Sequence, residues 1–184
     1  YREKIANVRE SREEKQNKFR ELAVQRKEEF QQRLMQVRDE RKKQIAQHIL
    51  ERLTSLKERL LNHFLDVLGH LETVLVNITT RTDKAVQAGI LGEEAVNEVY
   101  SKIDEAYEAI ASARGLVEDQ FDVVYSPEGE VDDIILRDVM KEMRDALKGD
   151  LEEVREAVKD AFKAVREAAV ALAQEPRVDE AEIE

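Results

Sequence analysis

The chain lacks cysteine and tryptophan, and its 184 residues include only two prolines, six glycines and 5% aromatic residues. Without cysteine it forms no disulfide scaffold, zinc–thiolate centre or cysteine-nucleophile active site. β-Sandwiches and α/β enzymes normally use more glycine, proline and aromatic residues in their turns and cores. A chain this poor in turn-forming residues and rich in Ala, Glu, Lys, Leu and Arg is typical of long helices. We therefore predict a single all-α domain.

Long hydrophobic runs are also missing. The most apolar stretch, Leu60 to Ile78, is interrupted by polar and charged side chains such as Asp66 and Glu72, so no segment reaches the roughly 18 uncharged apolar residues that a membrane span needs. The sequence contains no glycine-rich phosphate-binding loop and no glycine-flanked nucleophilic serine. From these absences we predict a protein that is not an enzyme, binds no cofactor and has no transmembrane span.

Charge is abundant and unevenly distributed. The chain has 41 acidic and 30 basic residues, a net charge of −11, which disfavours nonspecific binding of nucleic acid by the whole chain. Residues 1–44 carry 14 basic and 9 acidic side chains, a net of +5, so residues 45–184 carry a net of −16. The positive segment can dock on the negative segment of another copy, and we expect self-association through it.

The first 88 residues read as one very long helix or two collinear ones, because they contain no proline and only one glycine, Gly69. In the second half of this segment apolar residues recur every eleven positions, a spacing that favours a straight or slightly right-handed coiled-coil seam. The predicted rows are Leu34, Ile45, Leu56, Val67 and Ile78; Ile49, Leu60 and Leu71, with Thr82 as a polar break; and Leu53, Phe64 and Leu75, continued by Val86.

Two further helices follow. Gly89 suits a left-handed cap at the end of the first helix, and apolar residues spaced by three and four predict helices over about 93–124 and 132–174. Gly149 lies inside the last of these as a soft point. We predict an elongated antiparallel three-helix bundle over residues 45–174, with helices at about 45–88, 93–124 and 132–174. Residues 1–44 would project from it as a basic helical arm, and residues 175–184 would form a flexible tail.

Three segments carry a likeness to other proteins: NHFLDVLGHLETVLVNITTRTDKAVQAG, AYEAIASAR and RDALKGDLEEVREAVKDAFKAVREAAVALAQEPRVDE. Together they resemble a group of uncharacterised helical proteins of candidate-phylum (Patescibacteria) bacteria that are predicted to be secreted or envelope-anchored. The likeness covers about residues 35–180. It implies export, extracellular or at the cell envelope, and no particular reaction. A signal peptide removed before Tyr1 would fit that location.

One side of the first long helix carries a possible metal site. His63, Asp66 and His70 lie at positions i, i+3 and i+7, and two imidazoles with a carboxylate are ligands that zinc accepts. Two helical turns separate the histidines by about 10 Å, however, which is long for two ligands of one ion. We therefore treat these residues as weak candidates and favour a boundary role beside the apolar rows. A di-iron bundle is excluded, because no histidine has a glutamate three residues before it.

A cluster of acidic residues lies around the turn at Gly129 and consists of Glu128, Glu130, Asp132 and Asp133. The spacing of an EF-hand calcium loop is absent. Acids that cap the following helix are the favoured interpretation, and a weak calcium site stays open. Tyr100 and Tyr107, one heptad apart, are interpreted as packing at a seam edge rather than as a stacking platform.

The strongest candidate binding residues are basic. Arg38, Arg41, Lys42 and Lys43 form a positive patch that could hold a phosphate polymer, an anionic membrane surface or a partner. Interleaved glutamates and the scarcity of aromatic residues argue against sequence-specific nucleic-acid recognition. Our leading hypothesis is a non-enzymatic, exported helical scaffold or assembly protein of the cell envelope. The alternative is a binding module whose basic arm holds an anionic polymer or membrane surface.

Overall fold

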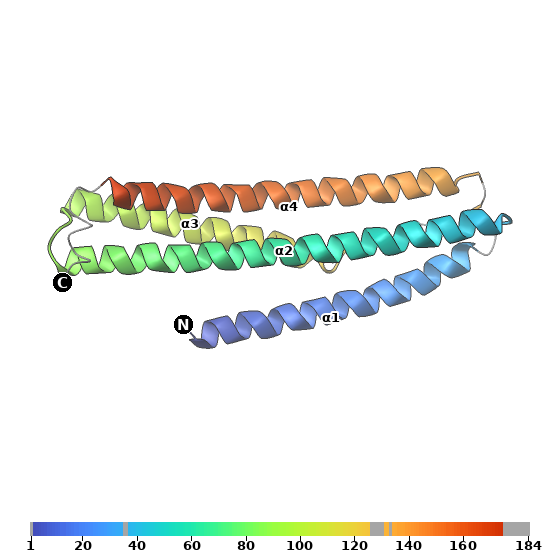
Figure 1. Ribbon diagram of the computed structural model, residues 1–184, viewed down its shortest axis with the longest axis horizontal. Helices are drawn as coiled ribbons and strands as arrows, with labels where there is room; N and C mark the ends of the chain where they lie inside the picture. Colours follow the sequence, from blue (N-terminus) through green and yellow to red (C-terminus); the bar gives the residue numbers. More distant parts are fainter. Residues whose placement is uncertain (1, 35–36, 126–130, 133, 175–184) are drawn as a thin grey trace. The chain divides into compact units, whose positions relative to one another are not determined.

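The structure, a computed structural model, describes residues 2–34, 37–125, 131–132 and 134–174, with side chains from residue 14 onward. Its helices are α1 (Arg2–Arg33), α2 (Glu40–Gln87), α3 (Glu93–Gln120) and α4 (Leu136–Ala173) (Figure 1). Within these described ranges there is no β-strand, so the prediction of an all-α fold is confirmed. No described helix is both long and apolar enough to cross a membrane. The predicted tail, 175–184, lies outside the described residues.

The chain divides into two compact units. Unit 1 comprises residues 1–62 and 117–153, and unit 2 comprises residues 63–116 and 154–184. Helices α2 and α4 therefore each contribute one part to unit 1 and another to unit 2. This division differs from the predicted boundary at residue 44, since α1 and the first part of α2 belong to the same unit.

In unit 1 the expected continuous helix is interrupted, because α1 ends at Arg33 and α2 begins at Glu40. Lys27 forms an ion pair with Glu51 at 2.7 Å, and Arg20 forms one with Glu58 at 2.8 Å. A step of seven residues back along α1 thus matches a step of seven residues forward along α2. The two helices form an antiparallel hairpin.

The prediction that residues 1–44 project as an arm is wrong, because the described part of α1 contributes to the core of unit 1. Phe19 and Phe30 are fully buried, and the Phe19 ring meets Phe121 edge-on with ring centroids 5.7 Å apart. Around the hairpin bend, Leu34 and Val37 pack in the same cluster as Phe30. These few large apolar side chains bury enough surface to hold α1 in place despite its many charges. Others in the cluster are Ala46, Leu50, Val131, Leu136, Met140 and Met143.

Unit 2 is built from residues 63–87 of α2, the part of α3 up to Leu116, and residues 154–173 of α4. Arg114 of α3 forms an ion pair with Glu72 of α2 at 2.6 Å. Nearer the connection between these helices, Tyr100 donates a hydrogen bond to Asp83, so α2 and α3 run antiparallel. The core of unit 2 contains Leu65, Leu68, Leu71, Leu75, Ile78, Thr82 and Ala85 from α2, Val99, Ile103, Ala106, Ile110 and Ala113 from α3, and Val154, Val158, Ala161, Val165, Ala168 and Leu172 from α4.

The buried face of α2 does not follow the predicted eleven-residue rows. Ile45 and Leu56 belong to the first predicted row, yet they are 57% and 41% exposed. Buried residues instead recur every seven positions, as at Leu68, Leu75 and Thr82, which is the spacing of helices packed with a left-handed twist. Thr82 does not break the seam, because its hydroxyl donates to the Ile78 carbonyl at 2.9 Å and needs no other partner.

The predicted left-handed cap at Gly89 is confirmed. Gly89 has φ of 67°, and the amide of Ile90 donates to the Ala85 carbonyl at 3.0 Å, the hydrogen bond of a Schellman motif. Gly89→Ala is expected to lower the free energy of unfolding by about 1–2 kcal/mol, because a Cβ is strained in this backbone region. Urea unfolding followed by circular dichroism measures the change.

Gly149 provides the matched control. It lies inside α4, and a Cβ added to it would meet no atom within 4 Å. Gly149→Ala is therefore expected to stabilise the protein by about 0.5–1 kcal/mol, since alanine loses less backbone entropy on forming a helix. Equal effects of the two substitutions would contradict the assignment of the Gly89 cap.

Candidate functional site

The predicted basic patch lies at the start of α2. The Asp39 carboxylate caps this helix, accepting hydrogen bonds from the backbone amides of Arg41 and Lys42 at 3.0 and 3.3 Å. Arg38, Arg41 and Lys42 are exposed, whereas the ammonium group of Lys43 lies 3.5 Å from the Glu40 carboxylate. The patch thus sits beside the bend of the α1–α2 hairpin, where the positive end of the α2 dipole adds to its charge.

The same part of α2 carries an exposed apolar row that the sequence had assigned to the core. Ile45 and Leu56 are largely exposed, and Ile49, between them, is half-buried. Arg52 and Arg59 flank the row and, together with Ile49 and Leu56, line a shallow groove of about 490 Å³. We call the exposed set Arg41, Ile45, Arg52, Leu56 and Arg59 the α2 outer face.

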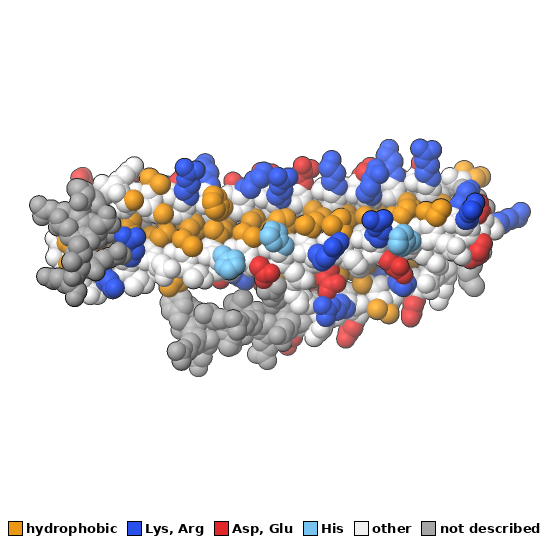
Figure 2. All heavy atoms as spheres, in the orientation of Figure 1, with side chains coloured by type: hydrophobic (Ala, Val, Ile, Leu, Met, Phe, Trp, Pro, Cys, Tyr) orange, Lys and Arg blue, Asp and Glu red, His pale blue; other side chains and the backbone are white. Residues whose placement is uncertain are grey.

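The acids of this helix segment are neutralised within unit 1, but the arginines of the α2 outer face are not. Glu51 and Glu58 are held by the ion pairs to α1 described above, and Lys27 lowers the pKa of Glu51 by hydrogen bonding and by its charge. Among the described residues, the structure gives none of Arg41, Arg52 and Arg59 an ion pair. In the space-filling view, Lys and Arg side chains border a band of hydrophobic side chains, with Asp and Glu side chains among them (Figure 2). The α2 outer face is therefore a positively charged surface with apolar side chains between the charges.

Unit 1 also contains a buried polar cluster centred on Lys57, which is only 1% exposed. Its ammonium group donates to the Val123 carbonyl at 2.6 Å and lies 4.7 Å from the centre of the Tyr125 ring. Burial lowers the pKa of Lys57 to about 8, and the charge of Asp150 partly opposes this effect. Tyr125 donates a hydrogen bond to Asp150, and its pKa is raised, first by burial and then by that bond.

The Lys57 cluster fits a structural role better than a catalytic one. A buried lysine with a lowered pKa is a common nucleophile in enzymes. A catalytic role would also require space for a substrate beside the amine. The cavity that Lys57, Tyr125 and neighbouring side chains line has a volume of about 10 Å³, room for one water molecule at most. A substrate does not fit there, and the amine instead ties residues 123–125 to α2.

The metal candidates do not come together. His63, Asp66 and His70 are all exposed on α2, and the nearest ring contact of His63 is Phe64, with centroids 6.1 Å apart. In the part of the chain that the structure describes, no group of three or more His, Cys, Asp or Glu side chains is placed to hold a metal ion. Their arrangement fits the boundary role favoured from the sequence.

Of the four residues at the acidic turn, Asp132 belongs to the described residues, and Glu128, Glu130 and Asp133 lie outside them. The Asp132 carboxylate accepts hydrogen bonds from the amides of Ile134 and Ile135 at 2.8 and 3.0 Å. These two bonds lower the pKa of Asp132. Asp132 therefore caps the approach to α4, as helix-capping acids do.

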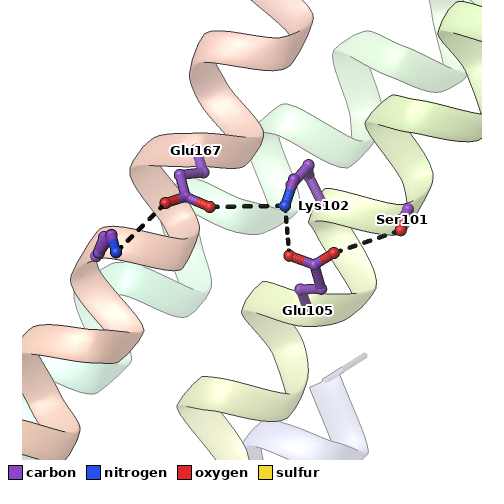
Figure 3. A network of polar contacts seen from close by, with 5 residues as sticks. Ser101, Lys102, Glu105 and Glu167 are labelled. Atoms are coloured by element: carbon purple, nitrogen blue, oxygen red, sulfur yellow. Dashed lines mark hydrogen bonds and ion pairs between the residues drawn. The ribbon is translucent and has the colours of Figure 1, made fainter.

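Unit 2 has its own charged network across α3 and α4 (Figure 3). Lys102 of α3 contacts Glu105 at 2.7 Å and Glu167 of α4 at 3.6 Å, and Lys163 approaches the same Glu167 at 3.9 Å. The hydrogen bond to Glu105 is the main cause of the raised pKa of Lys102. Cations and acids are interleaved here, so this network joins two helices rather than presenting one sign of charge to a ligand.

No protein-family model, curated protein or solved structure matches the chain.

Proposed function

We propose that the protein is a non-enzymatic helical scaffold that acts by assembling with other protein chains, including copies of itself. The observation that carries this proposal is the α2 outer face, an exposed apolar row flanked by arginines that form no ion pair with any described residue. Exposed apolar groups bordered by charge are typical of sites for protein association. The 10 Å³ cavity beside the buried Lys57 also supports a structural protein over an enzyme. Antiparallel helix packing supplies the body of the scaffold in this proposal.

Export to the cell envelope is part of the same proposal and is supported by the resemblance of residues 35–180 to predicted-secreted helical proteins. Immunoblotting of cell fractions, with an antibody against the protein, tests it in the organism of origin. The protein is expected in the envelope or the medium. Recovery with the cytoplasmic fraction alone would contradict export and leave the proposal of a scaffold unaffected.

Sedimentation velocity over a hundredfold range of protein concentration, at 50 and 500 mM salt, tests assembly. The weight-average mass is expected to rise above the monomer value with concentration and to fall at high salt, because screening weakens contacts between exposed charges. A monomer at every concentration and both salt levels would contradict the proposed assembly.

A second candidate function is the binding of an anionic polymer or membrane surface through Arg38, Arg41, Lys42 and Lys43. The observation that favours it is the position of these residues at the positive end of the α2 dipole. Replacing all four by glutamate is expected to abolish cosedimentation with vesicles rich in phosphatidylglycerol. The same change at Arg137, Lys141, Arg144 and Lys148, all exposed on α4, is the matched control. Absence of vesicle binding by the unmodified protein at low salt would exclude this candidate.

A further inference from the structure

We infer that the α2 outer face docks on the acidic outer surface of α3 in a second copy of the chain, so that copies associate head to tail. The inference rests on the proposed assembly function and identifies the two surfaces that meet. It depends on charge complementarity between two surfaces of the same protein, one in unit 1 and one in unit 2.

The α2 outer face is positive because the acids of the same helix segment already form ion pairs within unit 1. From Glu40 to Asn62, α2 has six basic and three acidic residues, a net of +3. Its acids pair with lysines or arginines of the same unit, Glu51 with Lys27, Glu58 with Arg20 and Glu40 with Lys43. Arg41, Arg52 and Arg59 therefore present their charge outward, with Ile45 and Leu56 between them.

The surface on which the α2 outer face docks is the outer side of α3. Over Glu93–Gln120 this helix has eight acidic and two basic residues, a net of −6. We call the exposed acids Glu94, Glu98, Asp104, Glu105 and Glu108 the α3 acidic face. Among the described residues, Glu105 is the one of these five with an ion pair, to Lys102 at 2.7 Å, so the other four carry the negative charge of the face. Ser101, which lies between Glu98 and Asp104, is small and lets another helix approach closely.

The spacing of the charges on the two faces also corresponds. Arg52 and Arg59 are seven residues apart on α2, and Glu98 and Glu105 are seven residues apart on α3. Seven residues span two helical turns, about 10 Å, so each pair lies on one side of its helix. Two helices packed side by side can therefore bring both arginines to both glutamates at once.

Other occupants of the α2 outer face fit less well. A symmetric dimer through this face alone would place arginines of one copy against arginines of the other, and such like-charge contacts are unfavourable. An anionic membrane could attract the arginines, but it would repel a chain with a net charge of −11. A contact between the α2 outer face and the α3 acidic face places opposite charges against each other on both surfaces. It leaves one of each free at the ends, so assembly can continue.

Reversing the charge of one face at a time tests the inference. Arg52→Glu with Arg59→Glu places acids of the α2 outer face opposite the acids of α3, and Glu98→Lys with Glu105→Lys places lysines of α3 opposite Arg52 and Arg59. Each double variant is expected to raise the dissociation constant measured by sedimentation at least about tenfold, because the two arginine–glutamate contacts become repulsive. An equimolar mixture of the two is expected to associate again, since each variant then meets a face of opposite charge.

Matched controls carry the same change in net charge elsewhere on the exposed surface. These are Lys148→Glu with Arg155→Glu, and Glu142→Lys with Glu153→Lys, all on α4. Circular dichroism and urea unfolding establish that every variant is folded. If the unmodified protein associates and the face variants associate as well as their controls, the inference is wrong while the assembly function stands. A mixture that stays monomeric would also overturn it. A monomeric unmodified protein would overturn the assembly function and this inference together.

Discussion

Replacing Phe30 by alanine is expected to lower the free energy of unfolding by about 3–5 kcal/mol, the range for truncating a fully buried phenylalanine. Phe30 is completely buried in the cluster at the α1–α2 bend, together with Leu34, Val37 and Met140. Its removal leaves a cavity where α1, α2 and the first turns of α4 meet. Urea unfolding monitored by circular dichroism measures the loss, with the midpoint falling and the slope unchanged.

Phe162→Ala is the matched control, because the same side chain on α4 is 57% exposed. We expect this control to change the free energy of unfolding by less than about 1 kcal/mol. If Phe30→Ala were as mild as Phe162→Ala, α1 would not be part of a cooperative core, and the projecting arm predicted from the sequence would be correct after all.

Composition and periodicity predict the all-α fold and the cap at Gly89, because both depend on local preferences. Scarce glycine and proline favour long helices wherever they occur, and a glycine at a helix end favours the left-handed region for steric reasons. The start of α3 is also predicted by a local signal, since Glu93 and Glu94 in its first turn follow Gly92. These features need no knowledge of what the helices pack against.

The hairpin between α1 and α2 is harder to predict, because residues 34–39 contain neither glycine nor proline. The bend is held by contacts between distant residues, above all those of Phe30 with the rest of its cluster. One local signal was present in the sequence. Asp39 stands directly before α2, where aspartate is a preferred helix-capping residue, and its carboxylate accepts a hydrogen bond from the backbone amide of Arg41.

The exposed face of α2 was misassigned for a related reason. A helix with apolar residues on more than half of its surface has several possible seams, and periodicity alone does not determine which one its partners cover. Ile45 and Leu56 matched an eleven-residue repeat, whereas burial follows a seven-residue one. The charge of Arg41, Lys42 and Lys43 was visible in the sequence, but the ion pairs that neutralise neighbouring acids became visible only in the folded chain.

Raising the pH from 7 to 9.5 is expected to stabilise the wild-type protein by about 2 kcal/mol relative to its Lys57→Met variant. Burial lowers the pKa of Lys57 in the folded protein to about 8, from 10.5. Between these values the unfolded chain keeps a proton that the folded protein has released, so stability rises with pH. Each unit of the pKa difference corresponds to about 1.4 kcal/mol. Methionine has a similar length but does not titrate, so the difference between the proteins isolates Lys57.

The pH range over which stability rises ends near pH 10, because Tyr125 titrates in the opposite sense. Its pKa is raised in the folded protein, so above pH 10 the unfolded chain loses the tyrosine proton first and stability falls. Urea unfolding of both proteins at pH 7, 8.5 and 9.5 therefore measures the contribution of Lys57.

The direction of the change decides which force dominates at Lys57. Burial disfavours the ammonium ion, whereas the Tyr125 ring at 4.7 Å and the Asp150 carboxylate favour it. A neutral amine can still donate to the Val123 carbonyl, so deprotonation relieves the buried charge without breaking the link between residues 123–125 and α2. Stability that falls between pH 7 and 9.5, relative to Lys57→Met, would instead mean that the ring and the carboxylate outweigh burial, and that Lys57 stabilises unit 1 as a cation.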